Sequence, residues 1–176
     1  SVSDVTTIKE KDRLRNYCKE VDEWFKGRNF KYLGKDHNID KIEWKIGFVK
    51  GYYEEGHPHT RGRIIILPSN IIEEDEKYIK RVLIHEKVHI YQRYNKEKVI
   101  RDLEYDGYYK KEHRTKEELI RGNPDIDEYI YTNPKGERMM FLYNSEEPNS
   151  IIDGETYGDY EHPFEMISYE IEKEYI

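Results

Sequence analysis

The decapeptide LIHEKVHIYQ, residues 83–92, places two histidines four positions apart, with a glutamate directly after the first. On an α-helix each residue advances about 100° around the axis, so His85 and His89 would lie about 40° apart and roughly 6 Å along it. Two imidazole groups in that arrangement can bind one metal ion. The segment therefore predicts a metal-binding helix with His85 and His89 as ligands.

Glu86 adds a possible catalytic group to this pair. On a helix it would project about 60° beyond His89 on the same side. A carboxylate there can accept a proton from a water molecule held by the metal, instead of binding the metal itself. Zinc in such a site lowers the pKa of its water toward neutrality and polarises a scissile carbonyl. The predicted chemistry is zinc-dependent hydrolysis of peptide bonds, with Glu86 as general base.

The surrounding residues favour this hypothesis over a helix that carries imidazoles by chance. Ile79, Val82, Leu83 and Ile90 predict a mostly buried helix. Because uncompensated polar groups are costly in an apolar interior, a buried helix seldom carries two histidines and a glutamate without a partner. A bound cation is the simplest such partner.

Catalytic zinc usually takes three protein ligands and a water molecule, so one ligand must come from elsewhere in the chain. A histidine six residues after the second one, with a glycine midway, would mark a metzincin. Asn95 and Gln92 occupy those places, which excludes that class. The remaining candidates are His113, Glu161, His162 and Glu165 downstream, and His57 and His59 upstream. Glu165 is favoured, because a closing helix that begins at Pro163 could present its carboxylate near its N-terminus.

Glu165 also has an alternative explanation. It would be the third residue of its helix, where a glutamate is favoured for capping and for the helix dipole. One turn further on, Ser168 and Tyr169 could hold the ligands in place. Three side chains ahead of this helix could donate a hydrogen bond to a developing oxyanion: Tyr157, Tyr160 and His162.

The first half of the chain contains the elements that would position this site. Helical spacing of apolar residues predicts a helix over residues 6–27, with Gly27 as its C-terminal cap. Alternating apolar residues predict a strand over residues 42–48, and RGRIIILPSN predicts a second strand that ends at Pro68. The metal helix should follow, capped by Ser69 or Asn70.

The second half shows weaker patterns. The expected elements are a helix over 99–109, a short helix introduced by a capping box at Thr115 and Glu118, a hairpin over 129–143 closed at 133–136, and a closing helix from Pro163. The basic residues Lys110, Lys111, His113 and Arg114 are predicted to form a solvated surface between helices. Together these elements predict an α+β fold, with a small twisted sheet packed on the metal helix.

Length and composition exclude several classes of protein. At 176 residues the chain is the size of one ordinary domain. Its 37 acidic and 30 basic side chains are spread along the whole length, which predicts no nucleic-acid partner. No apolar run reaches the roughly 20 residues of a membrane span, and the start lacks the apolar stretch of a secretory signal. A single cysteine, Cys18, fits a reducing compartment and so an intracellular location, although a secreted protein without disulfides would look the same.

The motif HEKVH on a helix after a short sheet, followed by a glutamate on a later helix, resembles the gluzincin group of zinc metallopeptidases. The resemblance implies His85, His89 and Glu165 as zinc ligands and Glu86 as general base. It also implies a zincin-like fold and a peptide or protein substrate that lies extended along the strand Arg63–Leu67. The 75 residues between His89 and Glu165 exceed the gluzincin norm, so the third ligand is the least constrained of the three.

A second likeness covers three segments in order, HEKVHIYQR, RGNPDIDEY and HPFEMISYE. They look like small zincin-like proteins encoded by large DNA viruses. The expected organisation is thus one zincin-like domain over residues 1–176, with an irregular insertion around 96–149. Two rival hypotheses keep the fold without peptidase activity: a virion or scaffold protein, with or without the metal, and a purely structural metal site. The viral likeness also implies a virion-associated location.

Overall fold

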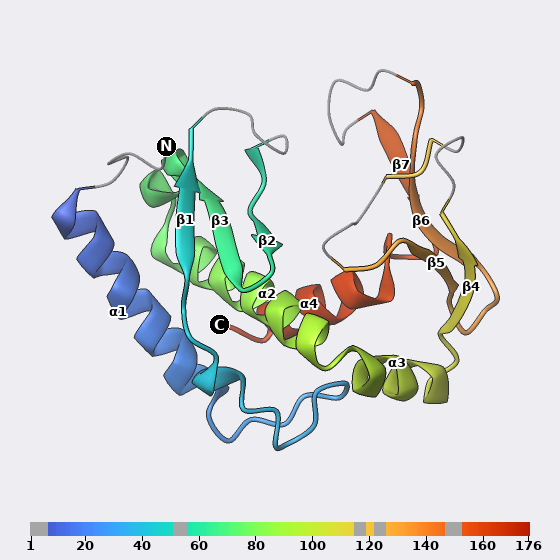
Figure 1. The fold of residues 1–176 in the computed structure, drawn as a ribbon, viewed down its shortest axis with the longest axis horizontal. Coiled ribbons are helices and arrows are strands. Elements are labelled where there is room, and N and C mark those ends of the chain that lie inside the picture. The colour runs from blue at the N-terminus through green and yellow to red at the C-terminus, as the bar shows by residue number, and fades with distance from the viewer. Residues whose placement is uncertain (1–6, 51–55, 115–118, 122–125, 147–152) are drawn as a thin grey trace. The chain divides into compact units, whose positions relative to one another are not determined.

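The structure is a computed structural model and describes residues 7–50, 56–114, 119–121, 126–146 and 153–176 (Figure 1). In these ranges the fold is mixed α+β, with four α-helices and two small sheets. The helices are α1 (Ile8–Phe25), α2 (Glu76–Tyr94), α3 (Lys96–Tyr105) and α4 (Pro163–Lys173). The strands are β1 (Ile46–Val49), β2 (His59–Arg61), β3 (Ile64–Pro68), β4 (Tyr109–His113), β5 (Tyr129–Thr132), β6 (Arg138–Tyr143) and β7 (Gly154–Tyr157). The α+β prediction is confirmed at this level.

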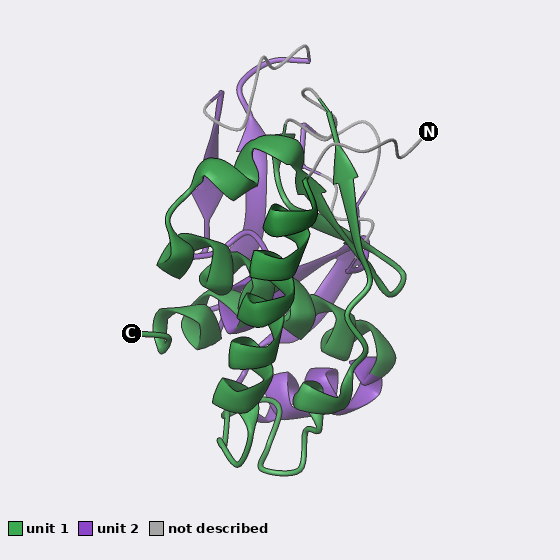
Figure 2. Cartoon of the chain, turned by 90° about the vertical axis from the view of Figure 1, so that its left-hand side faces the viewer, with its two compact units in different colours: residues 1–94, 168–176 green, residues 95–167 purple. Residues whose placement is uncertain are grey.

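The chain divides into two compact units (Figure 2). Unit 1 comprises residues 1–94 and 168–176, and unit 2 comprises residues 95–167. The division falls within α4, so this one continuous helix contributes residues to both units. None of the helices in the described ranges is long and apolar enough to cross a membrane.

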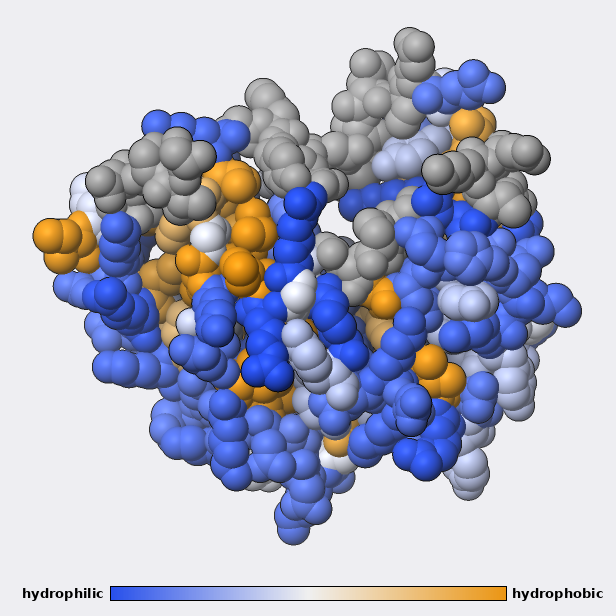
Figure 3. Space-filling view, in the orientation of Figure 1, coloured by the Kyte–Doolittle hydropathy of each residue, from blue (hydrophilic) through white to orange (hydrophobic). Residues whose placement is uncertain are grey.

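Unit 1 contains a three-stranded sheet in the order β1-β3-β2, with β1 parallel and β2 antiparallel to the central strand β3. Helix α2 packs behind this sheet in the view of Figure 1. Ile65 and Leu67 of β3 are fully buried, whereas Ile64 is 43% exposed, as the two-residue period of a strand requires. Ile64 lies on the face of the sheet that points away from α2, and Figure 3 shows hydrophobic residues on that side of the molecule.

The structure corrects the two strand predictions in unit 1. The first strand begins at Ile46 rather than at residue 42. A 3-10 turn over Ile39–Lys41 precedes it, and the Trp44 side chain donates a hydrogen bond from Nε1 to Asp22 Oδ2 instead of joining a strand face. The second segment forms a hairpin of two strands, β2 and β3, which turns at Gly62 with a φ of 58°. Strand β3 is thus central, and the expectation that residues 63–67 form a sheet edge is wrong.

The C-terminal cap of α1 agrees with the sequence prediction, whereas the N-terminal cap of α2 does not. Thr7 and Glu10 form a capping box at the start of α1, and Gly27 follows its end with a φ of 69°, which confirms the predicted C-terminal cap. The predicted cap of α2 is wrong, because Ser69 and Asn70 lie in a separate 3-10 turn. Asp75 caps α2 instead, since its Oδ1 accepts a hydrogen bond from the Tyr78 N–H at 2.9 Å.

Two buried lysines connect α2 to α1. Lys80 forms ion pairs with Glu20 and Glu76. Lys87 is fully buried, forms an ion pair with Asp22 and lies 4.0 Å from the centre of the Trp44 ring. Burial lowers the pKa of Lys87, although the hydrogen bond and charge of Asp22 act in the opposite direction. The middle residue of the HEKVH motif thus attaches α2 to α1 and to Trp44 within unit 1.

Replacing Asp22 with alanine is expected to lower the free energy of unfolding by about 3 kcal/mol, because it leaves a buried ammonium group without its counter-ion. Urea denaturation at neutral pH measures the change. Glu23→Ala is the matched control, since Glu23 pairs with Lys26 on the surface, where ion pairs add little stability. Equal stability of the two variants would contradict the assignment.

Unit 2 contains α3 and a four-stranded antiparallel sheet in the order β4-β5-β6-β7. The predicted hairpin is confirmed: β5 and β6 pair, and the Gly136 N–H donates to the Asn133 carbonyl across the turn. The helix predicted over 99–109 instead runs from Lys96 to Tyr105, because Gly107 takes a φ of 89° and ends the helical path.

The basic run of unit 2 lies on a strand, not between helices. Lys110, Lys111 and His113 belong to β4, whose five residues are all exposed, so the solvated surface is confirmed and the helical setting is wrong. The short helix predicted from Thr115 and Glu118 lies outside the described residues. The closing helix is confirmed, because α4 begins at Pro163 and buries Phe164, Ile167 and Ile171.

Candidate metal centre

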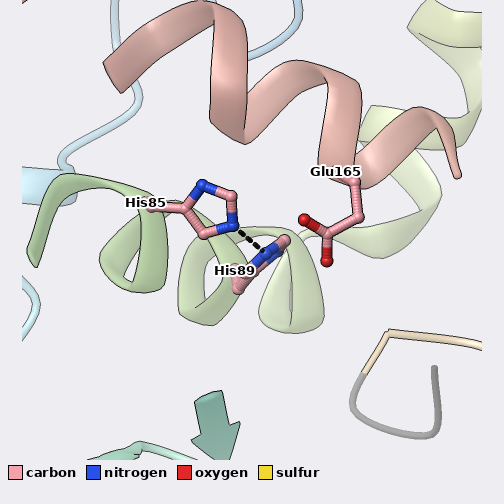
Figure 4. Close-up of side chains that lie close together, drawn as sticks. All are labelled: His85, His89 and Glu165. Carbon is pink, nitrogen blue, oxygen red and sulfur yellow. Dashed lines mark hydrogen bonds between the residues drawn. The ribbon is translucent and has the colours of Figure 1, made fainter. Parts of the chain in front are cut away.

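Helix α2 brings the side chains of the two histidines of the motif into contact. His85 is 9% exposed and His89 is 7% exposed. Their Nε2 atoms lie 2.9 Å apart, and their rings meet edge to face with centroids 4.6 Å apart (Figure 4). The four-residue spacing produces this geometry directly, since both side chains leave the same face of one helix.

Helix α4 supplies the carboxylate. One ligand atom each from His85, His89 and Glu165 lies within 4.8 Å of the other two, and Figure 4 shows the carboxylate turned toward the imidazoles. A tetrahedral zinc ion with bonds of about 2.1 Å holds its ligand atoms about 3.4 Å apart. The three predicted ligand residues therefore lie together, at separations that small side-chain movements would adapt to one ion.

The outer nitrogen of each ring contacts a side-chain oxygen. His85 Nδ1 lies 3.0 Å from Glu172 Oε2, and His89 Nδ1 lies 2.8 Å from Gln92 Oε1. Ser168 Oγ is also 3.3 Å from His89 Nδ1. The Glu172 carboxylate can only accept, so it keeps the ring proton of His85 on Nδ1 and leaves the lone pair on Nε2; an accepting Gln92 oxygen would do the same for His89. Metal-binding histidines are commonly oriented in this way.

This pattern has an electrostatic consequence for the two Nε2 atoms. If both rings carry their proton on Nδ1, two nitrogen lone pairs face each other across 2.9 Å. The repulsion is removed when one Nε2 carries a proton and donates it to the other, or when a metal cation lies between the two atoms. The Glu165 carboxylate beside them adds an anionic oxygen, which favours a divalent cation. The donor set therefore fits zinc.

The sequence predicted two of the residues that contact the histidines and did not predict the other two. Ser168 and Tyr169 were predicted to support the ligands, and Tyr169 indeed packs edge to face on His85, with ring centroids 4.7 Å apart. Gln92 and Glu172 were not predicted. A helical signal for Glu172 exists, because it lies seven residues after Glu165 and thus on the same face of α4.

Glu86 follows His85 on α2 and is 4% exposed, so it is shielded from bulk water. The cluster of possible ligand atoms found in the described residues does not include Glu86. Its expected role as a base that does not bind the metal remains a prediction.

The other candidates for third ligand have different surroundings. Both nitrogens of His162 are engaged, Nε2 with Asp127 at 2.9 Å and Nδ1 with the Phe164 N–H at 3.1 Å. Glu161 pairs with Arg121, and burial raises the pKa of this carboxyl group. His113 lies on exposed β4, and His59 contacts the carbonyl of His57. Of the proposed oxyanion donors, Tyr157 is 42% exposed and bonds to Glu155.

Glu172→Ala is expected to weaken zinc binding about 10- to 100-fold, the usual effect of removing the partner that orients a metal-binding histidine. Competition with a chromophoric chelator measures the affinity. Glu170→Ala on the exposed side of α4 should leave it unchanged. An equal effect of both substitutions would show that charge alone, not the contact to His85, matters.

Comparison of the chain with protein family models, curated proteins and solved structures finds no match.

Proposed function

We propose that this protein is a zinc-dependent metallopeptidase with a zincin-like fold, in which His85, His89 and Glu165 bind the metal. One observation carries the proposal. The two Nε2 atoms face each other at 2.9 Å beside the Glu165 carboxylate, while side-chain oxygens orient both rings from their far sides. Metal-binding histidines are held in this way, with one ring nitrogen oriented by a polar side chain and the other directed at the ion.

Each residue then has a defined task. A bound zinc ion supplies a Lewis acid that polarises a peptide carbonyl and acidifies a water molecule. Glu86, which is 4% exposed, would accept a proton from the attacking water and return it to the leaving amine. Glu172, Gln92 and Ser168 keep the imidazoles in one orientation, so no reorganisation is needed during the reaction.

The proposed place of the substrate moves from β3 to the edge strand β2. Arg93 lies one turn after His89 on α2, and its guanidinium donates hydrogen bonds to Thr60 Oγ1 at 3.0 Å and to the Gly62 carbonyl. The metal helix thus holds the β2–β3 hairpin directly. A peptide or protein substrate would add its extended backbone along β2. The same proposal includes an intracellular location, which the single cysteine suggests, or a virion-associated one, which the likeness to viral proteins implies.

The test combines metal analysis with a peptide library. We expect one zinc per chain, peptide cleavage detected by mass spectrometry, loss of cleavage with a chelator, and recovery on addition of zinc. Glu165→Ala serves as the matched variant with an incomplete ligand set. Stoichiometric zinc without any cleavage would instead support a structural metal site or a non-enzymatic protein, and absence of bound zinc would refute the metal site itself.

A further inference from the structure

A buried polar cluster in unit 2 lies at the start of α4. It consists of Asp127, Tyr131 and His162, which are 8%, 0% and 3% exposed. Asp127 accepts a hydrogen bond from Tyr131 Oη at 3.0 Å and from the Tyr129 N–H at 3.1 Å. Its Oδ1 lies 2.9 Å from His162 Nε2, and Lys96 forms an ion pair with it at 3.3 Å.

The hydrogen bonds determine the state of His162. Its Nδ1 accepts from the Phe164 N–H, so Nε2 carries the ring proton and donates it to Asp127. Burial by itself raises the pKa of Asp127, but the hydrogen bond from His162, together with the Tyr129 N–H and Lys96, lowers it overall. Asp127 is therefore a buried carboxylate that anchors a histidine.

His162 also caps α4. Its side chain accepts the N–H of Phe164 and its carbonyl accepts the N–H of Met166, while Pro163, between them in the sequence, has no N–H to satisfy. Serine, threonine, asparagine or aspartate would cap the helix without a buried anchor. Glu165 is the third residue of this helix, within one turn of the anchored cap.

We propose that Asp127 is a positioning residue for the metal centre: through His162 it sets the rotation and depth of the first turn of α4, and so aims the Glu165 carboxylate. The inference rests on the proposed metal site. Helix α4 is then held at two places around its ligand, by His162 before Glu165 and by Ser168 and Glu172 after it. A carboxylate held on both sides is pre-organised for the cation.

The test uses cobalt(II) alone as a probe of ligand geometry, in the full chain. Asp127→Asn weakens the anchor, and His162→Asn retains a helix-capping side chain but is too short to reach Asp127. Both variants are expected to bind zinc about 10- to 100-fold more weakly and to shift the visible cobalt spectrum toward that of Glu165→Ala. Tyr131→Phe is the matched control, because it removes one hydrogen bond to Asp127 and keeps the aromatic ring that packs on His162.

A purely stabilising cluster makes a different prediction. Tyr131→Phe and Asp127→Asn would then both lower the unfolding temperature, while affinity and spectrum stayed those of the wild type in both. That result would overturn the positioning role. If Asp127→Asn does not fold, an unchanged cobalt spectrum in His162→Asn would overturn it as well. A wild-type chain that binds neither cobalt nor zinc would refute the metal site as well, so the two failures are distinguishable.

Discussion

Glu86→Gln is expected to lower kcat for peptide hydrolysis by about 10²- to 10⁴-fold, the contribution of a general base, while zinc stays bound. The amide has the size of the carboxylate but cannot accept the proton of the attacking water. Glu86 lies outside the cluster of possible ligand atoms in the described residues, so the metal content should not change. A fluorogenic peptide assay and metal analysis of the same sample measure both quantities.

Glu170→Gln on the exposed side of α4 is the control for the loss of one negative charge. It should keep wild-type activity. Hydrolysis that survives in Glu86→Gln would refute the base assignment, and loss of zinc from that variant would make Glu86 a ligand instead.

Zinc is expected to stabilise the folded chain. At a free concentration 100 times its Kd, a ligand that binds only the native state adds about 2.7 kcal/mol, which raises the Tm of a chain of this size by about 5–10 °C. His89→Gln should remove this shift, because it eliminates one of the two facing Nε2 atoms. Thermal unfolding followed by circular dichroism, with and without zinc, measures the difference.

His113→Gln is the matched control for loss of an imidazole, since His113 lies on exposed β4. Its zinc-dependent shift should equal that of the wild type. A shift that persists in His89→Gln but disappears in His113→Gln would place the metal elsewhere and overturn the ligand assignment.

Features with a local physical cause were predictable from the sequence. The spacing of His85 and His89 determines their common face, because helical geometry repeats every 3.6 residues wherever the helix lies. Apolar spacing predicted the helix that forms α1, and Pro163 with the apolar stripe after it predicted the start of α4, because both signals act within a few turns of one helix. The β5–β6 hairpin followed from its Asn-Pro-Lys-Gly turn for the same reason.

Features that depend on distant neighbours were not predictable. Apolar and polar residues alternate over residues 42–45, which is the pattern of a strand. Trp44 is apolar for another reason, because it packs against Asp22 and Lys87. The central place of β3 follows from its pairing with β1 on one side and β2 on the other, and strand order has no local signal.

The sequence by itself determined the pairing of two of the three proposed ligand residues, because their relation lies within five residues of one helix. Only the tertiary structure placed Glu165, rather than Glu161, His162 or His113, beside them. The physical reason is that the direction of a side chain on α4 depends on how that helix is held. Its cap at His162 and its contacts through Ser168 and Glu172 come from segments far apart in the chain, and no spacing rule encodes them.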